Sequence, residues 1–376
     1  MAQEFVVLID ESLQQYDFGP QHPLGPIRVL LTYDEIRKHG ILNSPAVETS
    51  AITRSFDELL LTKVHTQTYV DAIKLASVTP DFFDIDHGIG STDVPRFDGM
   101  HEASAQVCAA TFTVTQAVAE GNAIHGVNIA GGLHHAMPNK ASGFCVYNDI
   151  AVSIQWLLDQ GYERIAYIDV DAHHGDGVEQ VFWDDPRVMT ISIHESGHTL
   201  FPGTGFSHDA GGPHALGFAV NIALPRHVDD ASWLRAFDAV VPELLEEFKP
   251  QVIFSQHGCD SHRADPLTNM ELSVDGQALS YRWIHEWAHT YAGGNWIAVG
   301  GGGYALYEVV PRIWTHLVAI ATHQDELVAF TDNETISFKK FHSGWDPHNE
   351  IDRAIMATRN SVFPHHGMIA DPFSRF

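Results

Sequence analysis

The sequence predicts an α/β fold in which a central, mostly parallel sheet is covered by helices on both faces. Short β-branched and apolar runs alternate along the chain with stretches of helical periodicity. Several of these runs are apolar throughout, as strands buried on both faces of a parallel sheet are. Clusters of Gly, Asp and His follow four of them. In doubly wound folds, functional sites lie beyond the carboxyl ends of the strands.

The individual elements can be assigned in chain order. The expected strands are Phe5–Ile9, Gly126–Ala130, Arg164–Val170, Val188–Ile193, Gly217–Ala223, Gln251–Gln256 and Asn295–Val299. The expected helices lie between them, at Ile27–His39, Gln67–Ala76, Gly99–Gly121, Asp149–Gln160, Asp230–Phe248, Ser273–Ala292 and Leu306–Thr322. This alternation predicts βαβ units. No repeat or linker interrupts it, so we expect one domain over residues 1–376. Residues 324–376 lose the periodicity and are expected to be a surface extension or a partly mobile tail.

Composition narrows the classes of function. The chain has 376 residues, with 21 Lys and Arg against 48 Asp and Glu, for a formal net charge of −27. This charge argues against a nucleic-acid partner, because such binding depends on Lys and Arg at phosphates. No apolar run approaches the roughly 18 residues of a membrane span. Three cysteines and a start without a basic leader predict a cytoplasmic protein with no membrane partner.

The segment Asp169-Val170-Asp171-Ala172-His173 has the spacing of a metal site. In an extended chain, side chains two residues apart share a face, so Asp171 and His173 can reach one cation. Asp260, after another expected strand, can supply a third ligand. Two carboxylates and one imidazole leave a coordination position open, as a catalytic zinc site requires. The alternative is that Asp169 and Asp171 cap a helix or solvate a loop.

A histidine pair and a tyrosine complete the set of candidate catalytic residues. His134 and His135 follow a Gly-Gly pair, which allows a turn that points both rings into a pocket. An imidazole near a metal-bound water is the usual general base, and Asp169 and Asp176 are available to orient the two rings. Tyr304 ends a run of four glycines and could polarise a carbonyl. The alternative for the pair is two core histidines bonded to the backbone.

Eight stretches of the chain together resemble the zinc-dependent histone deacetylase family, and within it the bacterial, class I-like acetoin-utilisation deacetylases. In order, they are Tyr16–Arg28, Asp93–Pro95, Gly131–Ala136, Ala141–Cys145, Asp169–Gly177, Phe201–Gly205, Gly258–His262 and Gly300–Tyr304. Eight matches in the family's order make a specific signal, which no single one would. The resemblance implies the arginase/deacetylase fold, with a central, mostly parallel sheet of about eight strands.

The resemblance also implies a role for each matching residue. The implied zinc ligands are Asp171, His173 and Asp260. The implied catalytic groups are the general base His135 with Asp176, the electrostatic His134 with Asp169, and the carbonyl-binding Tyr304. The implied substrate-binding residues are the tunnel walls Phe144 and Phe201, the adjacent Gly143, the rim carboxylate Asp93 and the inner-cavity Arg28. A structural K⁺ is implied at Asp169, Asp171, His173, Ser192 and the carbonyl of Ile193.

The implied activity is zinc-dependent hydrolysis of the acetyl-lysine amide in an acetylated protein or peptide, with Fe²⁺ as an alternative metal in the cell. The resemblance points to metabolic enzymes as substrates and leaves the oligomeric state open. Acetylpolyamines or longer acyl amides are the alternative substrates. A binding module with a decayed site is disfavoured by the intact ligand and catalytic set. A ureohydrolase would need a two-manganese cluster with more Asp ligands, and the aromatic tunnel residues would have no role.

One motif points elsewhere. His285-Glu286-Trp287-Ala288-His289 fits the H-E-x-x-H pattern of zinc proteases. With 25 histidines in the chain, a chance match is a real risk. The third ligand to be sought downstream, Glu308, is separated from the motif by an expected strand and the glycine run. We therefore interpret the motif as a solvated helix face.

Overall fold

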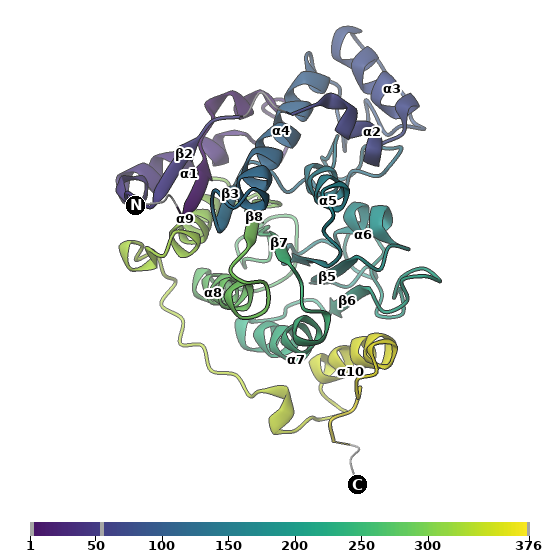
Figure 1. The fold of residues 1–376 in the computed structure, drawn as a ribbon, viewed down its shortest axis with the longest axis vertical. Helices are drawn as coiled ribbons and strands as arrows, with labels where there is room; N and C mark the ends of the chain where they lie inside the picture. The colour runs from purple at the N-terminus through teal and green to yellow at the C-terminus, as the bar shows by residue number, and fades with distance from the viewer. Residues whose placement is uncertain (1–3, 53–55, 374–376) are drawn as a thin grey trace.

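The computed structural model describes residues 4–52 and 56–373, and its centre is an eight-stranded parallel sheet (Figure 1). The strands are β1 (Phe5–Leu8), β2 (Val47–Ser50), β3 (His125–Asn128), β4 (Ile165–Asp169), β5 (Val188–Glu195), β6 (Ala219–Leu224), β7 (Val252–Gln256) and β8 (Trp296–Val299). Their order in the sheet is β2-β1-β3-β8-β7-β4-β5-β6, and every neighbouring pair is parallel. The predicted parallel sheet of about eight strands is confirmed.

Helices cover both faces of this sheet. They are α1 (Ile27–Lys38), α2 (Leu61–Val64), α3 (Gln67–Val78), α4 (Met100–Ala119), α5 (Asp149–Asp159), α6 (Asp176–Phe182), α7 (Asp230–Phe248), α8 (Val274–Tyr291), α9 (Val310–Ala321) and α10 (Glu350–Val362). The seven predicted helices are all present, with ends that differ by up to four residues. Several begin at a capping side chain: Ser273 accepts a hydrogen bond from the Gly276 N–H at the start of α8.

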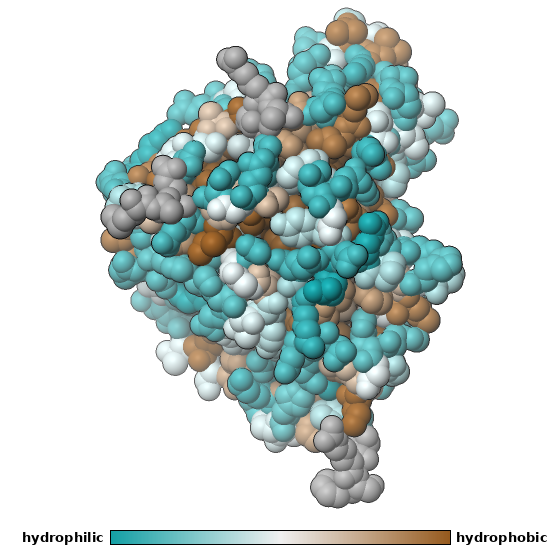
Figure 2. All heavy atoms as spheres, viewed as in Figure 1, coloured by the Kyte–Doolittle hydropathy of each residue, from teal (hydrophilic) through white to brown (hydrophobic). Residues whose placement is uncertain are grey.

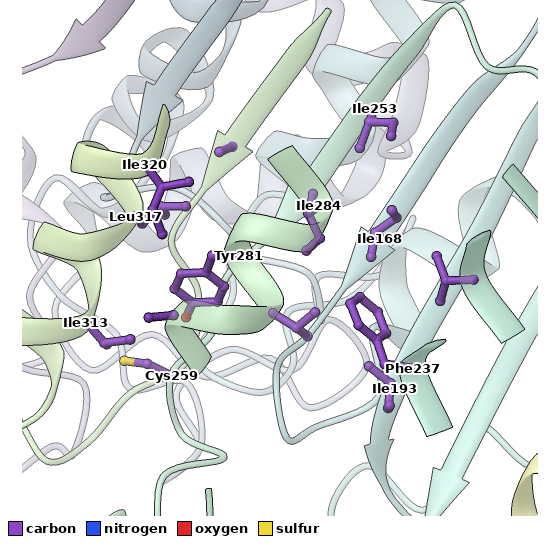
Figure 3. Packing of buried hydrophobic residues seen from close by; sticks show 14 of the residues in the cluster. Ile168, Ile193, Phe237, Ile253, Cys259, Tyr281, Ile284, Ile313, Leu317 and Ile320 are labelled. Carbon is purple, nitrogen blue, oxygen red and sulfur yellow. The ribbon is translucent and has the colours of Figure 1, made fainter. Parts of the chain in front are cut away.

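Two hydrophobic cores lie on the two faces of the sheet. One packs the strands against α1, α7, α8, α9 and α10, and part of it is shown in Figure 3. The other packs them against α2, α3, α4, α5 and α6. Side chains alternate between the two along each strand, so Ile168 of β4 belongs to the first core and Tyr167 to the second. Burial on both faces explains why the strands read as continuous apolar runs.

Four described elements are absent from the sequence prediction: β2, α2, α6 and α10. Only Val47 of β2 is buried, because β2 is a short strand at the sheet edge. The helices α2 and α6 are only four and seven residues long, too short to show a periodicity. The helix α10 has 13 residues, so its length does not explain why the sequence did not predict it.

The C-terminal extension is ordered around α10, which corrects the prediction of lost periodicity. The helix packs on β6 and α7 (Figure 1). Ile351, Ile355 and Val362 are buried at helical spacing, and the Asn349 side chain caps the N-terminus by accepting from the N–H groups of the first turn. Residues 324–349 are mostly irregular, and this long polar stretch hides the helical pattern that follows it.

We predict that Arg359→Ala lowers the free energy of unfolding by about 2–4 kcal/mol, because a buried charge with several partners is removed. The Arg359 guanidinium donates to the carbonyls of Ala370 (2.7 Å) and Ala239 (2.6 Å) and to Glu243, and it stacks on Phe363. Urea denaturation of the full chain measures the loss. Arg353→Ala, at an exposed site on the same helix, is the control and should change the free energy by less than about 0.5 kcal/mol.

The visible surface of the molecule is mostly polar. In Figure 2, hydrophilic residues dominate the visible face, and hydrophobic residues gather mainly near α3. Exposed apolar side chains there include Leu75 and Val78 of α3. Within residues 4–52 and 56–373, no helix is both long and apolar enough to cross a membrane.

Candidate active site

The four clusters of Gly, Asp and His come together at one edge of the sheet. They follow β3, β4, β7 and β8, which are neighbours in the order β3-β8-β7-β4. Because these strands are parallel, their carboxyl ends meet at the same edge. The predicted catalytic and metal-binding side chains buried there are His134, His135, Asp169, Asp171, His173, Asp176 and Asp260. The sequence prediction that strand ends converge is confirmed.

Three of these residues form a cluster that could hold a metal. One ligand atom from each of Asp171, His173 and Asp260 lies within 4.8 Å of the other two. Nδ1 of His173 lies 2.8 Å from Asp260 Oδ2 and 3.1 Å from Asp171 Oδ1. Burial would lower the pKa of His173, but the two carboxylates outweigh burial and raise it well above its usual value. Burial and the nearby Asp171 raise the pKa of Asp260 to about 7, so a cation between the two carboxylates would relieve their repulsion; the donor set fits Zn²⁺ with one position open.

Glycines from neighbouring strand ends make room for the two carboxylates. A Cβ atom on Gly258 would lie 2.0 Å from Asp171 Oδ2, and one on Gly302 would lie 2.2 Å from Asp260 Oδ2. The Gly302 N–H and the Gln256 side-chain amide each donate to Asp171 Oδ2 at 2.8 Å. The glycine run thus serves close approach of the backbone to the carboxylates, in addition to presenting Tyr304.

The histidine pair lies beside the metal-ligand cluster, and each ring has an acidic partner. His134 Nδ1 lies 2.7 Å from Asp169 Oδ2, and His135 Nδ1 lies 2.6 Å from Asp176 Oδ1. The two Nε2 atoms are 3.0 Å apart. The rings therefore occupy the predicted positions opposite their predicted carboxylates.

The two histidines differ in charge. Burial opposes the charged form of His134, but Asp169 and Asp171 outweigh it and raise its pKa to about 9. Burial lowers the pKa of His135, and the neighbouring charge of His134 lowers it further, against the pull of Asp176. At pH 7 His134 is thus an imidazolium and His135 is neutral. A neutral imidazole with an unprotonated ring nitrogen has the form that a general base requires.

Above the metal-ligand cluster lies a cavity of about 190 Å³ that opens to the surface. Its lining residues are Asp93, His135, Gly143, Phe144, His173, Leu200, Phe201, Leu267 and Tyr304. The Phe201 ring is 44% exposed and lies edge-on to the His135 ring, with centroids 5.0 Å apart. Asp93 Oδ2 accepts from the Gly143 N–H at 2.8 Å, on the partly exposed rim. The predicted wall and rim residues therefore line one cavity.

The phenol of Tyr304 and the ring of Phe144 lie together in the wall of this cavity. Their ring centroids are 5.7 Å apart and nearly perpendicular. Burial, Asp260 and Asp171 hold the pKa of Tyr304 well above its usual value, so the phenol keeps its proton and can donate it. Phe144 has a positive φ of 66°, which is uncommon for an aromatic residue. The Tyr16 hydroxyl stabilises this turn by donating to the Phe144 carbonyl at 2.7 Å.

A smaller cavity of about 20 Å³ lies behind the histidine pair, and Arg28 lines it as predicted. The buried Arg28 guanidinium donates to the Gly303 carbonyl at 3.0 Å and lies over the Trp314 ring. The cavity has room for about one water-sized group. A fixed cation at its wall suits an anionic or carbonyl-bearing molecule.

The residues of the implied K⁺ site lie on adjacent strands. Asp169 at the end of β4 pairs with Ser192 of β5, and Ile193 follows Ser192. Asp169 Oδ1 already accepts from the Asp171 N–H at 3.1 Å, and the Ser192 hydroxyl lies 2.8 Å from His194 Nδ1. These contacts neither form nor exclude a ligand shell, so K⁺ binding stays a prediction.

Sequence reasoning missed several residues of the site. Gln256 ends β7 and contacts Asp171, and its position at a strand end was a usable signal. Asp149 accepts from the N–H groups of Gly132 and Leu133 and so orients the turn before the histidine pair. It was hidden because Asp in the first turn of a helix normally reads as a helix-terminus charge. Other lining residues, Leu200 and Leu267, carry no sequence signal.

The H-E-x-x-H motif lies on α8, away from this site. Its two histidines contact other side chains and are not simply exposed to solvent, which corrects the interpretation as a solvated helix face. His285 is half-buried, and both rings lie against His125 and His323. Glu308 is not part of this group.

Comparison with known proteins agrees with the geometry. The family model for the histone deacetylase domain matches residues 22–321. The acetoin utilization protein AcuC of Bacillus subtilis is 43% identical over 314 residues, which cover 83% of this chain and 80% of that protein. The proteins of the same name from Staphylococcus aureus strain MRSA252 and Staphylococcus xylosus are 37% and 35% identical, over 82% and 81% of this chain and 79% of each relative.

Proposed function

Because the chain belongs to the histone deacetylase family, in its acetoin-utilisation branch, we propose that it is a zinc-dependent enzyme that hydrolyses the acetyl-lysine amide. The observation that carries the proposal is a buried Asp-His-Asp cluster at the base of an aromatic-walled cavity, with a neutral histidine and a protonated phenol on the cavity wall. The eight-stranded sheet and the match over residues 22–321 support one catalytic domain, with an extension after it whose helix α10 packs on β6 and α7.

Substrate binding follows from the shape and charge of the cavity. Phe144 and Phe201 would pack against the methylene groups of an acyl-lysine side chain, which suit an apolar channel with a polar end. The Asp93 carboxylate would accept hydrogen bonds from peptide N–H groups at the rim, since Gly143 satisfies only one of its oxygens. The formal net charge of −27 would attract peptides rich in Lys and Arg.

The chemistry would be divided among the groups at the base. Asp171, His173 and Asp260 would hold a Zn²⁺ ion, whose chemistry there would be to acidify a water and to polarise the substrate carbonyl. Nε2 of His135 would take the proton from the attacking water and later deliver it to the leaving amine. His134, as an imidazolium paired with Asp169, would stabilise negative charge that develops on the substrate.

Other residues around the base of the cavity would interact with the acetate product and with a second ion. The Arg28 guanidinium at the wall of the inner cavity would attract the acetate anion as it leaves the base of the site. We also propose a structural K⁺ at the pair Asp169 and Ser192 between β4 and β5. The names of the related proteins refer to acetoin utilization, so we place the substrate among proteins of that metabolism.

We predict that Tyr304→Phe lowers kcat by about 10²–10³-fold while leaving the metal content unchanged, because one oxyanion donor is lost and no metal ligand is touched. Acetate release from an acetyl-lysine peptide and elemental analysis of the same sample measure the two effects. Tyr307→Phe, at an exposed side chain on the same segment, is the matched control. A kcat within threefold of wild type in Tyr304→Phe would exclude the phenol from the reaction.

The proposed substrate class is tested with a panel of an acetyl-lysine peptide, acetylspermidine, acetylputrescine and a peptide with a longer acyl chain. We expect acetate release from the acetyl-lysine peptide at the highest kcat/KM, and loss of that release on treatment with a chelator. Turnover of the acetylpolyamines alone would agree with the proposed mechanism of hydrolysis but would contradict acetyl-lysine as the substrate. No turnover of any member after addition of Zn²⁺ would overturn the proposed activity.

A further inference from the structure

Four histidines from three separate parts of the chain converge at the edge of the sheet opposite the active site. They are His125 at the start of β3, His285 and His289 in the last turns of α8, and His323 just after α9. One ring nitrogen of each lies within 4.8 Å of the corresponding nitrogens of the other three. Nε2 of His285 lies 2.8 Å from Nε2 of His323 and 3.1 Å from Nε2 of His289. We call these residues the four-histidine cluster.

The topology explains why the cluster is separate from the deacetylase site. Catalytic groups follow the carboxyl end of β3, whereas His125 is its first residue. Helices α8 and α9 precede and follow the parallel strand β8, so their carboxyl ends lie at the amino edge of the sheet. The two helices pack against one another, and α9 contacts β3 (Figure 1). The cluster therefore joins three elements at the opposite end of the fold.

His125 is oriented as a metal ligand is. Its side chain is fully buried, and its Nδ1 lies 2.6 Å from the carbonyl of Ala321, to which the Nδ1–H must donate. The proton is thus fixed on Nδ1, which leaves a lone pair on Nε2. This Nε2 atom is buried and has no hydrogen-bond partner among the residues that the structure describes. Ligating histidines commonly donate their second nitrogen to a backbone carbonyl in this way.

Charged side chains of both signs lie beside the cluster: Asp325 pairs with Arg282, which lines the same surface cavity as His285 and His323. His125 is fully buried and His285 is half-buried, and their rings lie nearly perpendicular with centroids 5.1 Å apart. Glu4 and Asp325 lie close enough to interact electrostatically with His323. His285 and His323 also line a surface cavity of about 240 Å³, which gives an ion access from solvent.

We propose that the four-histidine cluster is a second metal site, which binds Zn²⁺ or a similar late first-row divalent ion through four imidazole nitrogens. Imidazole is a preferred ligand of these ions, and four protein ligands leave no open position, so the site is structural. Ligand nitrogens around tetrahedral Zn²⁺ are about 3.3 Å apart, close to the 2.8 and 3.1 Å found here. The exposed rings of His289 and His323 can supply the remaining adjustment.

The site accounts for the two histidines of the H-E-x-x-H motif. At i and i+4 on α8, His285 and His289 present their rings side by side, as two ligands of one ion must. The other two ligands complete the coordination, so no position is left for the water that a protease requires. The bound ion would tie the ends of α8 and α9 to the start of β3.

Metal counting tests the proposal without reference to deacetylase activity. The full-length protein is stripped with a chelator, dialysed against micromolar Zn²⁺ and analysed for metal. We expect two equivalents per wild-type chain and one in His289→Gln/His323→Asn, where Asn tolerates the positive φ of 56° at His323. His348→Gln, at an exposed histidine outside the cluster, should keep two. One equivalent in the wild type, or two in the double variant, would overturn the proposal.

A second arm isolates the new site and guards against misfolding of the double variant. In the Asp171→Asn/Asp260→Asn background, Co²⁺ should bind at one equivalent and give the intense visible bands of tetrahedral coordination. Adding His289→Gln/His323→Asn should abolish these bands. Zn²⁺ should raise the Tm of the first protein and leave that of the second unchanged, with equal far-UV circular dichroism. Co²⁺ bands that persist in both proteins would contradict the assignment, whatever the outcome for deacetylation.

Discussion

Asp260→Ala should abolish acetate release, with a loss in kcat of about 10³-fold or more. Asp260 is one of three proposed metal ligands, and its Oδ2 lies 2.8 Å from His173 Nδ1 inside a fully buried cluster. Removing it leaves one carboxylate and one imidazole, too few to retain Zn²⁺ against a chelator. Loss of the metal removes several kcal/mol of stabilisation of the transition state, and each 1.36 kcal/mol is worth tenfold in rate.

The experiment combines activity with metal analysis on a background in which only the catalytic site binds metal. His289→Gln/His323→Asn provides this background, because it removes two ligands of the four-histidine cluster. We expect one equivalent of Zn²⁺ in the background protein and none after Asp260→Ala. Asp86→Ala, at an exposed carboxylate, is the control and should retain both metal and activity. Full occupancy in the Asp260→Ala protein would remove Asp260 from the ligand set.

His135→Ala should lower kcat by about 10²–10⁴-fold without loss of metal. The neutral imidazole donates its Nδ1–H to Asp176 at 2.6 Å, and the ring lines the cavity with its Nε2 3.0 Å from Nε2 of His134. The other two histidines at the base are less suited to this role: Asp169 and Asp171 hold His134 as an imidazolium against the effect of burial, and His173 is a proposed ligand.

Binding separates this role from a structural one. A hydroxamate analogue of the substrate contacts the metal and the cavity walls and needs no proton transfer, so His135→Ala should still bind it. His208→Ala, at an exposed histidine, is the matched control. Turnover by His135→Ala within tenfold of wild type would require another base. Loss of hydroxamate binding together with activity would mean that the ring shapes the cavity instead.

The sequence predicts much of the catalytic edge because its ligands sit at strand ends. Asp171, His173 and Asp260 could be grouped from spacing and from the rule that parallel strands deliver their carboxyl ends to one edge. The order β3-β8-β7-β4, which makes these ends neighbours, is a tertiary property that no local pattern encodes. For the same reason Leu200 and Leu267, which line the cavity from loops, could not be foreseen.

The features that the sequence did not predict were missed for different physical reasons. β2 buries one residue, so an edge strand of four residues leaves no alternating or apolar run to recognise. α10 has the helical spacing of Ile351, Ile355 and Val362, but it follows a long irregular segment and was grouped with it. The four-histidine cluster shows most clearly what cannot be predicted from local sequence patterns. His125 and His323 lie far from His285 in the sequence, and only the packing of α8 and α9 against β3 brings them together.

The most direct test of the proposed function is a zinc titration of acetate release from an acetyl-lysine peptide, with chelator-stripped His289→Gln/His323→Asn protein. We predict no release by the stripped protein and a rise in rate that is linear up to one equivalent of Zn²⁺ and then constant. A parallel anaerobic titration with Fe²⁺ compares the two metals at the same site. Undiminished release by the stripped protein, or no release at any amount of either metal, would contradict a metal-dependent lysine deacetylase.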